Sequence, residues 1–181
     1  MLEFVKDFRR KQIIRELKNA KRDKKIENID EIKNIGVICN LDYEQNWNIV
    51  YHFAKVMENQ GKTVRIMAMR QKDQDLSFVV THQATYICRN KTDFNFWGLP
   101  NWECIRDFVE QPYDLLIDTT GEDNFFAQYI ALRTKANLKA AYATPSEDPS
   151  DIFDLIIRGE GQIDLKDFFN NIIEYLGMIK K

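Results

Sequence analysis

The sequence predicts a three-layer α/β protein, in which helices cover both faces of a mostly parallel sheet of five or six strands. Short β-branched or apolar runs alternate along the chain with segments of helical periodicity, which is typical of parallel sheets. One run, YDLLID at 113–118, is apolar almost throughout and is therefore expected to be buried on both faces. The 181 residues, 44% of them hydrophobic, suffice for one such domain.

The first part of the chain contains four expected elements. Residues 2–25 repeat apolar side chains at helical spacing, which predicts a helix with a narrow apolar stripe. The run IKNIGVIC predicts a strand over about 34–39, and the following YEQNWNIVYHFAKVMENQ predicts a helix. Gly61 suits the position just past this helix, because glycine adopts the left-handed backbone that often ends helices. KTVRIMAM predicts a second strand over about 63–69.

The rest of the chain continues the alternation. Asp164 suits the N-cap of the last helix. About nine residues around TPSEDPSD separate the last two strands, whereas a parallel crossover usually needs a dozen or more. The last strand is therefore either antiparallel or reached through a loop without a helix, in a sheet of Rossmann-like order. We expect strands over 84–89, 113–118, 138–143 and 152–157, helices over 102–110, 122–134 and 165–179, and an aromatic loop or hairpin over 93–101.

Charge is distributed unevenly along the chain. Residues 1–25 contain ten Lys and Arg against four acids, whereas the remainder contains sixteen against twenty-four. We therefore expect a basic amphipathic helix within residues 1–30, followed by a single Rossmann-like domain over 31–181. The basic arm either docks on the acidic body or binds nucleic acid or an anionic surface through residues 6–25. The apolar stripe favours docking, and aromatic residues for base stacking are scarce in the arm, which argues against nucleic acid.

Composition excludes several classes of protein. Twelve Phe, seven Tyr and three Trp argue against disorder. No apolar stretch approaches the roughly 20 residues that span a bilayer, and the charged start MLEFVKDFRRKQII lacks the apolar core of a signal peptide. Cys39, Cys88 and Cys104 are an odd number without CxxC spacing, so we expect reduced thiols in a cytoplasmic protein.

The stretch DTTG that follows YDLLID is the first candidate site, because open α/β sheets bind ligands where their strands end. In one interpretation, Asp118 is an acid–base or metal-binding carboxylate, and the hydroxyls of Thr119 and Thr120 contact a ligand. In the other, which we favour, Thr120 is the N-cap of the next helix, and Glu122 and Asp123 stabilise its first turn. Two carboxylates at this position would repel a phosphate group.

The loop after the first strand, CNLDYE, is the second candidate site. A dinucleotide or P-loop site needs glycines here, so that the backbone can approach phosphate, and this loop offers bulk and negative charge instead. Asn40 and Asp42, placed beside Asp118 at the same edge of the sheet, suit a neutral polar ligand or a cation. Capping of the next helix by Asp42 is the simpler interpretation. The chain has neither a zinc-binding motif nor a complete dinucleotide-binding motif, so we predict no cofactor and no metal.

The aromatic segment DFNFWGLPNW is the third candidate. Aromatic side chains are mostly buried, so we expect them to fill the core or cover the sheet edge. Alternatively, they form a patch that binds a protein partner, because Trp and Phe often anchor interfaces. The candidates for partner binding are Phe94, Phe96, Trp97 and Trp102.

Longer stretches resemble known proteins. YDLLIDTTGEDNFFAQYIALRTKANLKAAYA and FDLIIRG…DLKDFFNNIIEYLGMI, with GVICN and DFNFWGLP, resemble an uncharacterised bacterial family of small single-domain proteins over about 1–179. This resemblance implies a Rossmann-like fold and no assigned activity. Over about thirty residues, YDLLIDTTG and ALRTKANLKAAY are also similar to the N-terminal half of heptosyltransferase-type glycosyltransferases. In that class the sugar nucleotide is held mainly by a second domain.

The sequence favours a non-catalytic binding or protein-interaction module on a nucleotide-binding-like scaffold that lacks phosphate-binding motifs. It would recognise a protein partner through the aromatic segment, the basic arm or both. The alternative is a transferase-like or hydrolytic enzyme that uses Asp118 and Asp42, with Asn40, at the switch point of the sheet. This alternative predicts that these side chains converge on a pocket and that a carboxylate there has a strongly shifted pKa.

Overall fold

The computed structural model describes most of the chain, and the structural statements below concern only the residues it describes. Several residues singled out above lie outside this part: Asp42, Phe96, Trp97, Glu122 and Asp123. The described residues are 2–19, 22–41, 43–70, 77–79, 84–89, 92–95, 99–121, 124–143, 152–159 and 164–180.

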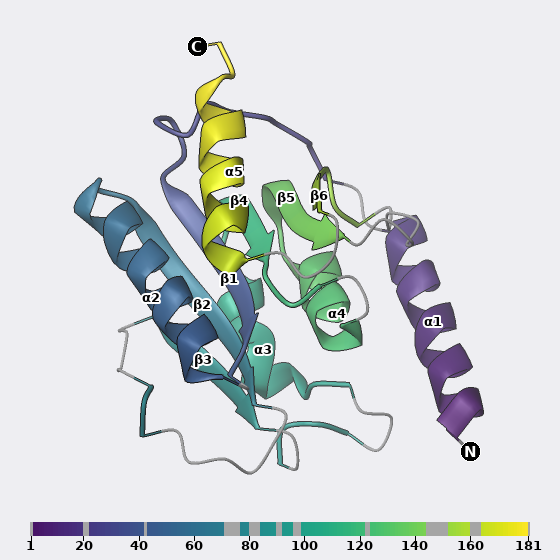
Figure 1. The fold of residues 1–181 in the computed structure, drawn as a ribbon. Helices are drawn as coiled ribbons and strands as arrows, with labels where there is room; N and C mark the ends of the chain where they lie inside the picture. The colour runs from purple at the N-terminus through teal and green to yellow at the C-terminus, as the bar shows by residue number, and fades with distance from the viewer. Residues whose placement is uncertain are drawn as a thin grey trace.

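A six-stranded sheet forms the centre of the fold, and all of its strands run parallel in the order β3-β2-β1-β4-β5-β6 (Figure 1). The central neighbours β1 and β4 are separated along the chain by two other strands, so the order reverses between them. This is the strand order of a Rossmann-like fold, which confirms the predicted fold class. The strands are β1 Asn34–Asn40, β2 Thr63–Arg70, β3 Thr85–Arg89, β4 Tyr113–Asp118, β5 Ala136–Ala143 and β6 Leu155–Arg158.

Helices cover both faces of the sheet. On one face, α2 and α5 pack around the fully buried side chains of Trp47 and Phe168. On the other face, α3 and α4 pack around Phe108 and Ile130, and α1 lies beside α4 (Figure 1). No helix in the described ranges is long and apolar enough to cross a membrane. The helices are α1 Leu2–Asn19, α2 Glu44–Asn59, α3 Trp102–Val109, α4 Phe125–Arg133 and α5 Leu165–Gly177.

Gly36 in β1 makes room for a buried tyrosine on β4. A Cβ atom at this position would lie 2.8 Å from Cδ1 of Leu116 and 3.0 Å from Cε1 of Tyr113. Tyr113 occupies that space and donates its hydroxyl proton to the carbonyl oxygen of Phe108, 2.9 Å away. The glycine of GVIC therefore allows one side chain to fasten the end of α3 to the central strands.

Most predicted elements are confirmed to within a few residues, and the predicted strand over 113–118 coincides with β4. Gly61 has a φ of 79° just past α2, as expected for a helix-ending glycine. Asp164 caps α5 by accepting a hydrogen bond from the backbone N–H of Lys166 at 2.8 Å. β6 runs parallel to β5, so the antiparallel alternative is wrong.

The start of α4 differs from the prediction. The helix begins at Phe125 and its N-cap is Asn124, whose side-chain oxygen accepts hydrogen bonds from two backbone N–H groups of the first turn at 3.1 and 3.2 Å. Thr120 is therefore not the cap. Glu122 and Asp123 precede the helix, and its first turn contains no acid. The expected repulsion of anions by first-turn carboxylates does not apply to this helix.

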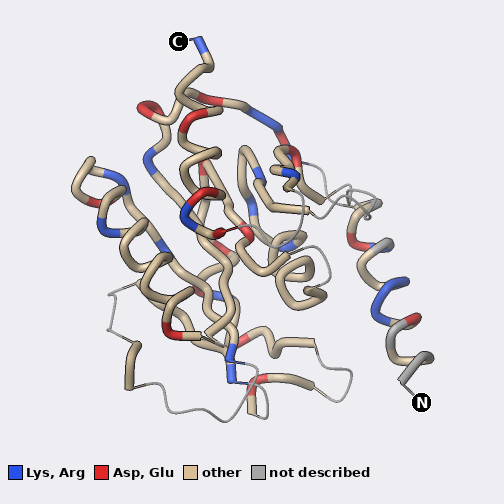
Figure 2. The backbone as a smooth tube through the Cα atoms, viewed as in Figure 1, with Lys and Arg blue, Asp and Glu red and all other residues tan. Residues whose placement is uncertain are grey.

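The basic helix α1 docks on the body, as its apolar stripe favoured. Ile13 is buried against the core on the α4 side of the sheet. The carboxylate of Glu16 lies 3.0 Å from the guanidinium of Arg133 on α4. The helix ends at Asn19, earlier than predicted, and residues 22–28 have no regular secondary structure. Figure 2 shows Lys and Arg on α1 and on the segment that follows it.

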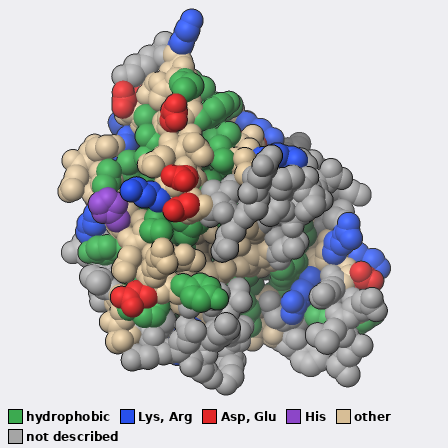
Figure 3. Space-filling model, in the orientation of Figure 1, with side chains coloured by type: hydrophobic (Ala, Val, Ile, Leu, Met, Phe, Trp, Pro, Cys, Tyr) green, Lys and Arg blue, Asp and Glu red, His purple; other side chains and the backbone are tan. Residues whose placement is uncertain are grey.

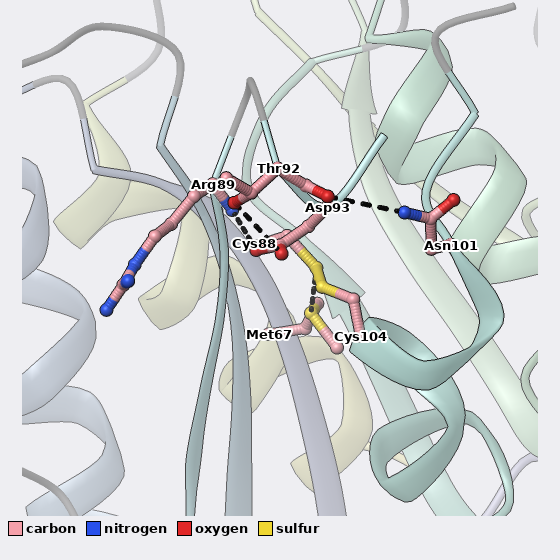
Figure 4. Close-up of a disulfide and its surroundings, with 7 residues drawn as sticks. All are labelled: Met67, Cys88, Arg89, Thr92, Asp93, Asn101 and Cys104. Atoms are coloured by element: carbon pink, nitrogen blue, oxygen red, sulfur yellow. Dashed lines mark hydrogen bonds between the residues drawn. A yellow bond between two sulfur atoms is a disulfide. The ribbon is translucent and has the colours of Figure 1, made fainter. Parts of the chain in front are cut away.

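Two of the three cysteines form a disulfide, so the expected reduced state is wrong for them. Cys88 at the end of β3 is bonded to Cys104 in α3, and their Cα atoms lie 6.1 Å apart, a usual separation (Figure 4). The sulfur of Met67 lies 4.0 Å from that of Cys88 in the same core. Among the described residues, Cys39 is a free cysteine and is buried.

In the aromatic segment between β3 and α3, the described residues 93–95 and 99–101 pair with each other, as the predicted hairpin form requires. Phe94 pairs with Pro100 in an isolated antiparallel bridge. The ring of Phe94 lies 5.4 Å from that of Phe126, against the core on the α4 side. Trp102, the first residue of α3, remains 41% exposed.

Candidate functional site

The strand order reverses between β1 and β4, at the carboxyl edge of the sheet. α2 follows β1 on one face and α4 follows β4 on the other, so the chain leaves the two central strands in opposite directions. Open α/β sheets bind ligands at such a switch point. Asn40 ends β1 and Asp118 ends β4, which brings two predicted site residues to this edge.

Asp118 is a fully buried carboxyl group with one satisfied oxygen. Its Oδ1 accepts hydrogen bonds from the backbone N–H of Thr120 at 2.8 Å and from the Thr120 hydroxyl at 2.7 Å. Its Oδ2 is buried and has no partner among the described residues. Burial raises the pKa of the Asp118 carboxyl from 3.8 to about 7, and the two Thr120 bonds only partly oppose this shift. The structure therefore favours the protonated acid up to about neutral pH.

Thr119 and Gly121 shape the turn that follows β4. Both the backbone N–H and the hydroxyl of Thr119 donate to the carbonyl oxygen of Ile38, at 2.9 and 3.0 Å, and so tie the end of β4 to β1. Gly121 has a φ of 87°, and a Cβ there would lie 3.0 Å from the hydroxyl oxygen of Tyr142. This turn thus needs glycine both for its backbone and for the approach of Tyr142.

Asn40 contacts the cap of α4 across the switch point. The side-chain amide of Asn124 donates to Oδ1 of Asn40 at 3.2 Å. Because Asn124 also caps α4, its side chain links the end of β1 to the start of α4. This hydrogen bond engages Oδ1 of Asn40 within the protein.

A crevice of about 300 Å³ lies beside this switch point, between the N-terminal ends of α2 and α5. Four of its described lining residues are uncharged with polar side chains and come from three parts of the fold, and the one charged residue among those described is the cap Asp164. Figure 3 views the face covered by α2 and α5, on which hydrophobic and charged side chains are interspersed. The described residues that line the crevice are Gln45, Asn46, Ile49, Thr119, Tyr142, Asp164 and Leu165.

The crevice is equipped for hydrogen bonding and lacks a strong nucleophile among its described lining residues. Amide, hydroxyl and phenol groups offer both donors and acceptors to a ligand. Burial, helped by the charge of Asp118, raises the pKa of the nearby Cys39 thiol to about 12, which keeps the sulfur protonated and unreactive. No group of three or more potential metal ligands occurs in the described part of the chain.

The predicted site residues occupy different positions relative to the crevice. Thr119 lines it, whereas Asp118, Asn40 and Thr120 are not among its described lining residues. Asp42 lies outside the described residues, so its predicted role stays a prediction. Sequence reasoning missed the lining role of Gln45, Asn46 and Tyr142. The first two were recognisable as first-turn residues of the helix that follows β1, but Tyr142 resembled an ordinary strand residue.

The four candidates for partner binding differ in where they lie. Phe94 packs in the core, and Trp102 is partly exposed on α3. Phe96 and Trp97 lie outside the described residues. Their proposed role in binding a protein stays a prediction.

The fold and the switch-point crevice define the chain as a single-domain Rossmann-like protein with an all-parallel sheet of six strands. Residues 6–179 match a family model described as "Family of unknown function (DUF6913)". The match covers almost the whole chain, and the protein belongs to this family. The resemblance to an uncharacterised family is thereby confirmed.

No curated protein and no solved structure matches the chain. The comparisons therefore give no support to the local likeness to heptosyltransferase-type glycosyltransferases. The function must therefore be inferred from the fold and from the chemistry of the side chains in this protein.

Proposed function

We propose that this protein is a non-catalytic binding module that holds a small, neutral or cationic polar molecule in the switch-point crevice. The observation that carries this proposal is the lining: amides, a hydroxyl, a phenol and one carboxylate, with no Lys, Arg or His among the described lining residues. These described residues offer no positive side chain to a phosphate-bearing ligand. Neutral polar ligands and amines suit these groups directly.

The N-terminal turns of the two helices beside the crevice support the same class of ligand. The N-termini of α2 and α5 carry partial positive charge, which by itself attracts anions. However, Glu44 lies in the first turn of α2, and Asp167 lies in that of α5. Asp164 adds a third carboxylate as the cap of α5. These acids offset the positive potential that a nucleotide-binding protein presents to phosphate.

Calorimetry of a ligand panel with two matched variants tests the proposal. The panel consists of sugars, polyols and amines, with ATP, NAD and UDP-glucose as phosphate-bearing members. Asn46→Leu removes an amide from the crevice, whereas Asn48→Leu changes the same residue type at an exposed position of α2. We expect a neutral or amine ligand whose binding is weakened by the first variant only. A nucleotide that shows this pattern would contradict the proposal.

One observation favours a second candidate function, an enzyme that transfers a proton through Asp118. Its free Oδ2 and its pKa near neutrality are properties of a general acid or base. Asp118 is completely buried and is not among the described lining residues of the crevice, which supports binding as the first choice. A ligand found with the panel decides between the two functions: its conversion by the wild type and not by Asp118→Asn would establish the enzyme.

We also propose a bacterial, cytoplasmic protein that contacts a protein partner through Trp102, the basic arm or both. Trp102 is 41% exposed, and Arg10, Lys11 and Arg15 of α1 are exposed, which supports such a contact. The Cys88–Cys104 disulfide is unusual for the cytoplasm, where thiols are kept reduced. Cell fractionation followed by immunodetection of the protein tests the location: recovery in the cytoplasmic fraction is expected, and recovery only outside the cytoplasm would contradict it.

A further inference from the structure

A second cavity lies at the opposite, amino edge of the sheet. Thr134 and Lys135, which precede β5, and Val109, which ends α3, form part of its wall. The C-terminal part of α1 and the segment over 22–24 form another part, and this segment runs along the upper edge of the sheet in Figure 1. Its volume of about 690 Å³ lies within the range of small-molecule sites.

Positive side chains dominate the charged lining of this cavity. Five of the described lining residues are Lys or Arg and two are acids. One of the acids, Glu16, is already paired with Arg133 at 3.0 Å. The cationic lining residues are Arg22, Lys24, Arg133, Lys135 and Lys139.

Lys139 is the most buried of these cations, with 3% of its surface exposed. Its Nζ donates a hydrogen bond to the carbonyl oxygen of Ala131 at the end of α4. The nearest carboxylate, Asp154, is already engaged by Arg22 and, at 2.9 Å, by Lys24. Lys139 therefore lies in the protein interior without a carboxylate of its own.

The charges around Lys139 favour binding of a negative group in the cavity. Burial, together with the positive charges of Arg22 and Lys24, lowers its pKa to about 7, and the carboxylate of Asp154 opposes this shift only in part. A negative group placed in the cavity would relieve this repulsion and favour the charged ammonium. On α4, Nε of Arg133 is also buried without a hydrogen-bond partner among the described residues.

The remaining wall of the cavity is apolar. Leu17 from α1, Trp102 from α3 and Leu132 from α4 face the cavity, together with Val109 and Ile152. Trp102 is 41% exposed, although it is a large apolar side chain beside a cavity. A ligand with an apolar body would cover it and gain the corresponding hydrophobic free energy.

We propose that this cavity binds a small organic acid, with its carboxylate near Lys139 and Lys135 and its apolar body against Trp102. The cation cluster supplies the complement to the carboxylate, and the apolar wall selects for a hydrocarbon or aromatic body. This inference does not depend on the function proposed for the crevice at the carboxyl edge, because none of the lining residues is shared.

Calorimetry with three matched probes tests this inference on the full chain. Decanoate has both a carboxylate and an apolar tail, acetate has only the carboxylate, and decyltrimethylammonium has a similar tail with the opposite charge. All are used below the concentration at which the long-chain probes form micelles. We expect saturable binding of decanoate alone, with quenching or a shift of Trp fluorescence from Trp102.

Two variants locate the binding, and a third serves as control. Lys139→Met keeps an unbranched side chain that is one atom shorter and removes the charge, and we expect it to weaken decanoate binding about tenfold or more. Trp102→Ser changes a partly exposed residue, so the fold should persist while binding weakens through loss of the apolar contact. Lys166→Met removes an exposed lysine of α5 and should leave binding unchanged.

The result that would overturn the inference is equally specific. Equal binding of decanoate and decyltrimethylammonium would show that charge does not select the ligand. Unchanged decanoate affinity in both Lys139→Met and Trp102→Ser, or absence of binding by the wild type, would exclude the cavity as an organic-acid site.

Discussion

The two edges of the sheet bury ionisable side chains of opposite kinds. At the carboxyl edge, Asp118 is fully buried, and the one charged residue among the described lining of the nearby crevice is an acid. At the amino edge, Lys139 is buried beside a larger cavity whose charged lining is mostly basic. The pKa of Asp118 is raised to about 7 and that of Lys139 is lowered to about 7.

The comparison shows that burial without a dedicated counter-charge drives both groups toward neutrality. The two groups must then affect stability in opposite pH ranges. Ionisation of Asp118 costs stability as the pH rises from 3.8 to about 7, because the native state holds its proton longer than the unfolded chain does. Protonation of Lys139 costs stability as the pH falls from 10.5 to about 7, because the unfolded chain binds this proton first.

The largest effect is expected for Asp118→Asn, which keeps an oxygen for the two Thr120 bonds and cannot ionise. Its stability relative to the wild type should rise from pH 4 to pH 8 by on the order of 4 kcal/mol, because three pKa units correspond to this free energy. Urea unfolding at several pH values measures the difference. Asp107→Asn, at an exposed position, should show little pH dependence; a flat profile for Asp118→Asn as well would refute the burial argument.

The counterpart at the other edge is Lys139→Met. This variant should exceed the wild type in stability most at pH 6, by on the order of 3 kcal/mol, with the lost Ala131 hydrogen bond reducing the gain. The advantage should shrink toward pH 10, because the wild-type lysine approaches its ordinary pKa of 10.5, above which it is neutral in both states. The same unfolding series with Lys166→Met provides the control, and an advantage that grew with pH would contradict the assignment.

A smaller effect is expected for Asn124→Ala at the carboxyl edge. The change removes the cap of α4 and the contact with Asn40, so stability should fall by about 1 kcal/mol. Asn48→Ala, in the exposed middle of α2, should cost nothing or add slight stability. Thermal unfolding of both variants gives the comparison, and equal melting temperatures would mean that the cap contributes no stability.

The smallest effect is expected for Glu16→Gln, which removes the ion pair between α1 and Arg133 at the amino edge. Both side chains are partly exposed, so the loss should be about 0.5 kcal/mol and should disappear in high salt. Urea unfolding with and without added NaCl measures it. A loss that persists in high salt would indicate that Glu16 acts through packing instead of charge.

The central strands and most helices were predictable because buried segments show a recognisable pattern of apolar residues in the sequence. β4 is buried nearly throughout, so YDLLID could only be read as a strand, and its end at Asp118 followed. The start of α4 was not predictable with the same accuracy, because Thr120 and Asn124 both suit an N-cap. The hydrogen bonds of Asn124 decide between them.

The amino-edge cavity could not be predicted, because its walls come from segments far apart in the chain. Leu17, Trp102 and Lys139 come together only when α1 and α3 pack near β5. One local signal was present: Lys139 lies in the apolar run LKAAYA, where a lysine must be buried or reach around a strand. The disulfide had no signal at all, since Cys88 and Cys104 are 16 residues apart without a motif.

An amide chemical-shift titration tests the difference between the two edges most directly. The protein is titrated separately with decanoate and with ATP, while the amides of Thr134, Lys135 and Lys139 report on one edge and those of Gln45, Asn46 and Thr119 on the other. We expect decanoate to shift the amide signals at the amino edge, and we expect neither ligand to shift those at the carboxyl edge. Saturable shifts of Gln45, Asn46 and Thr119 on addition of ATP would contradict it.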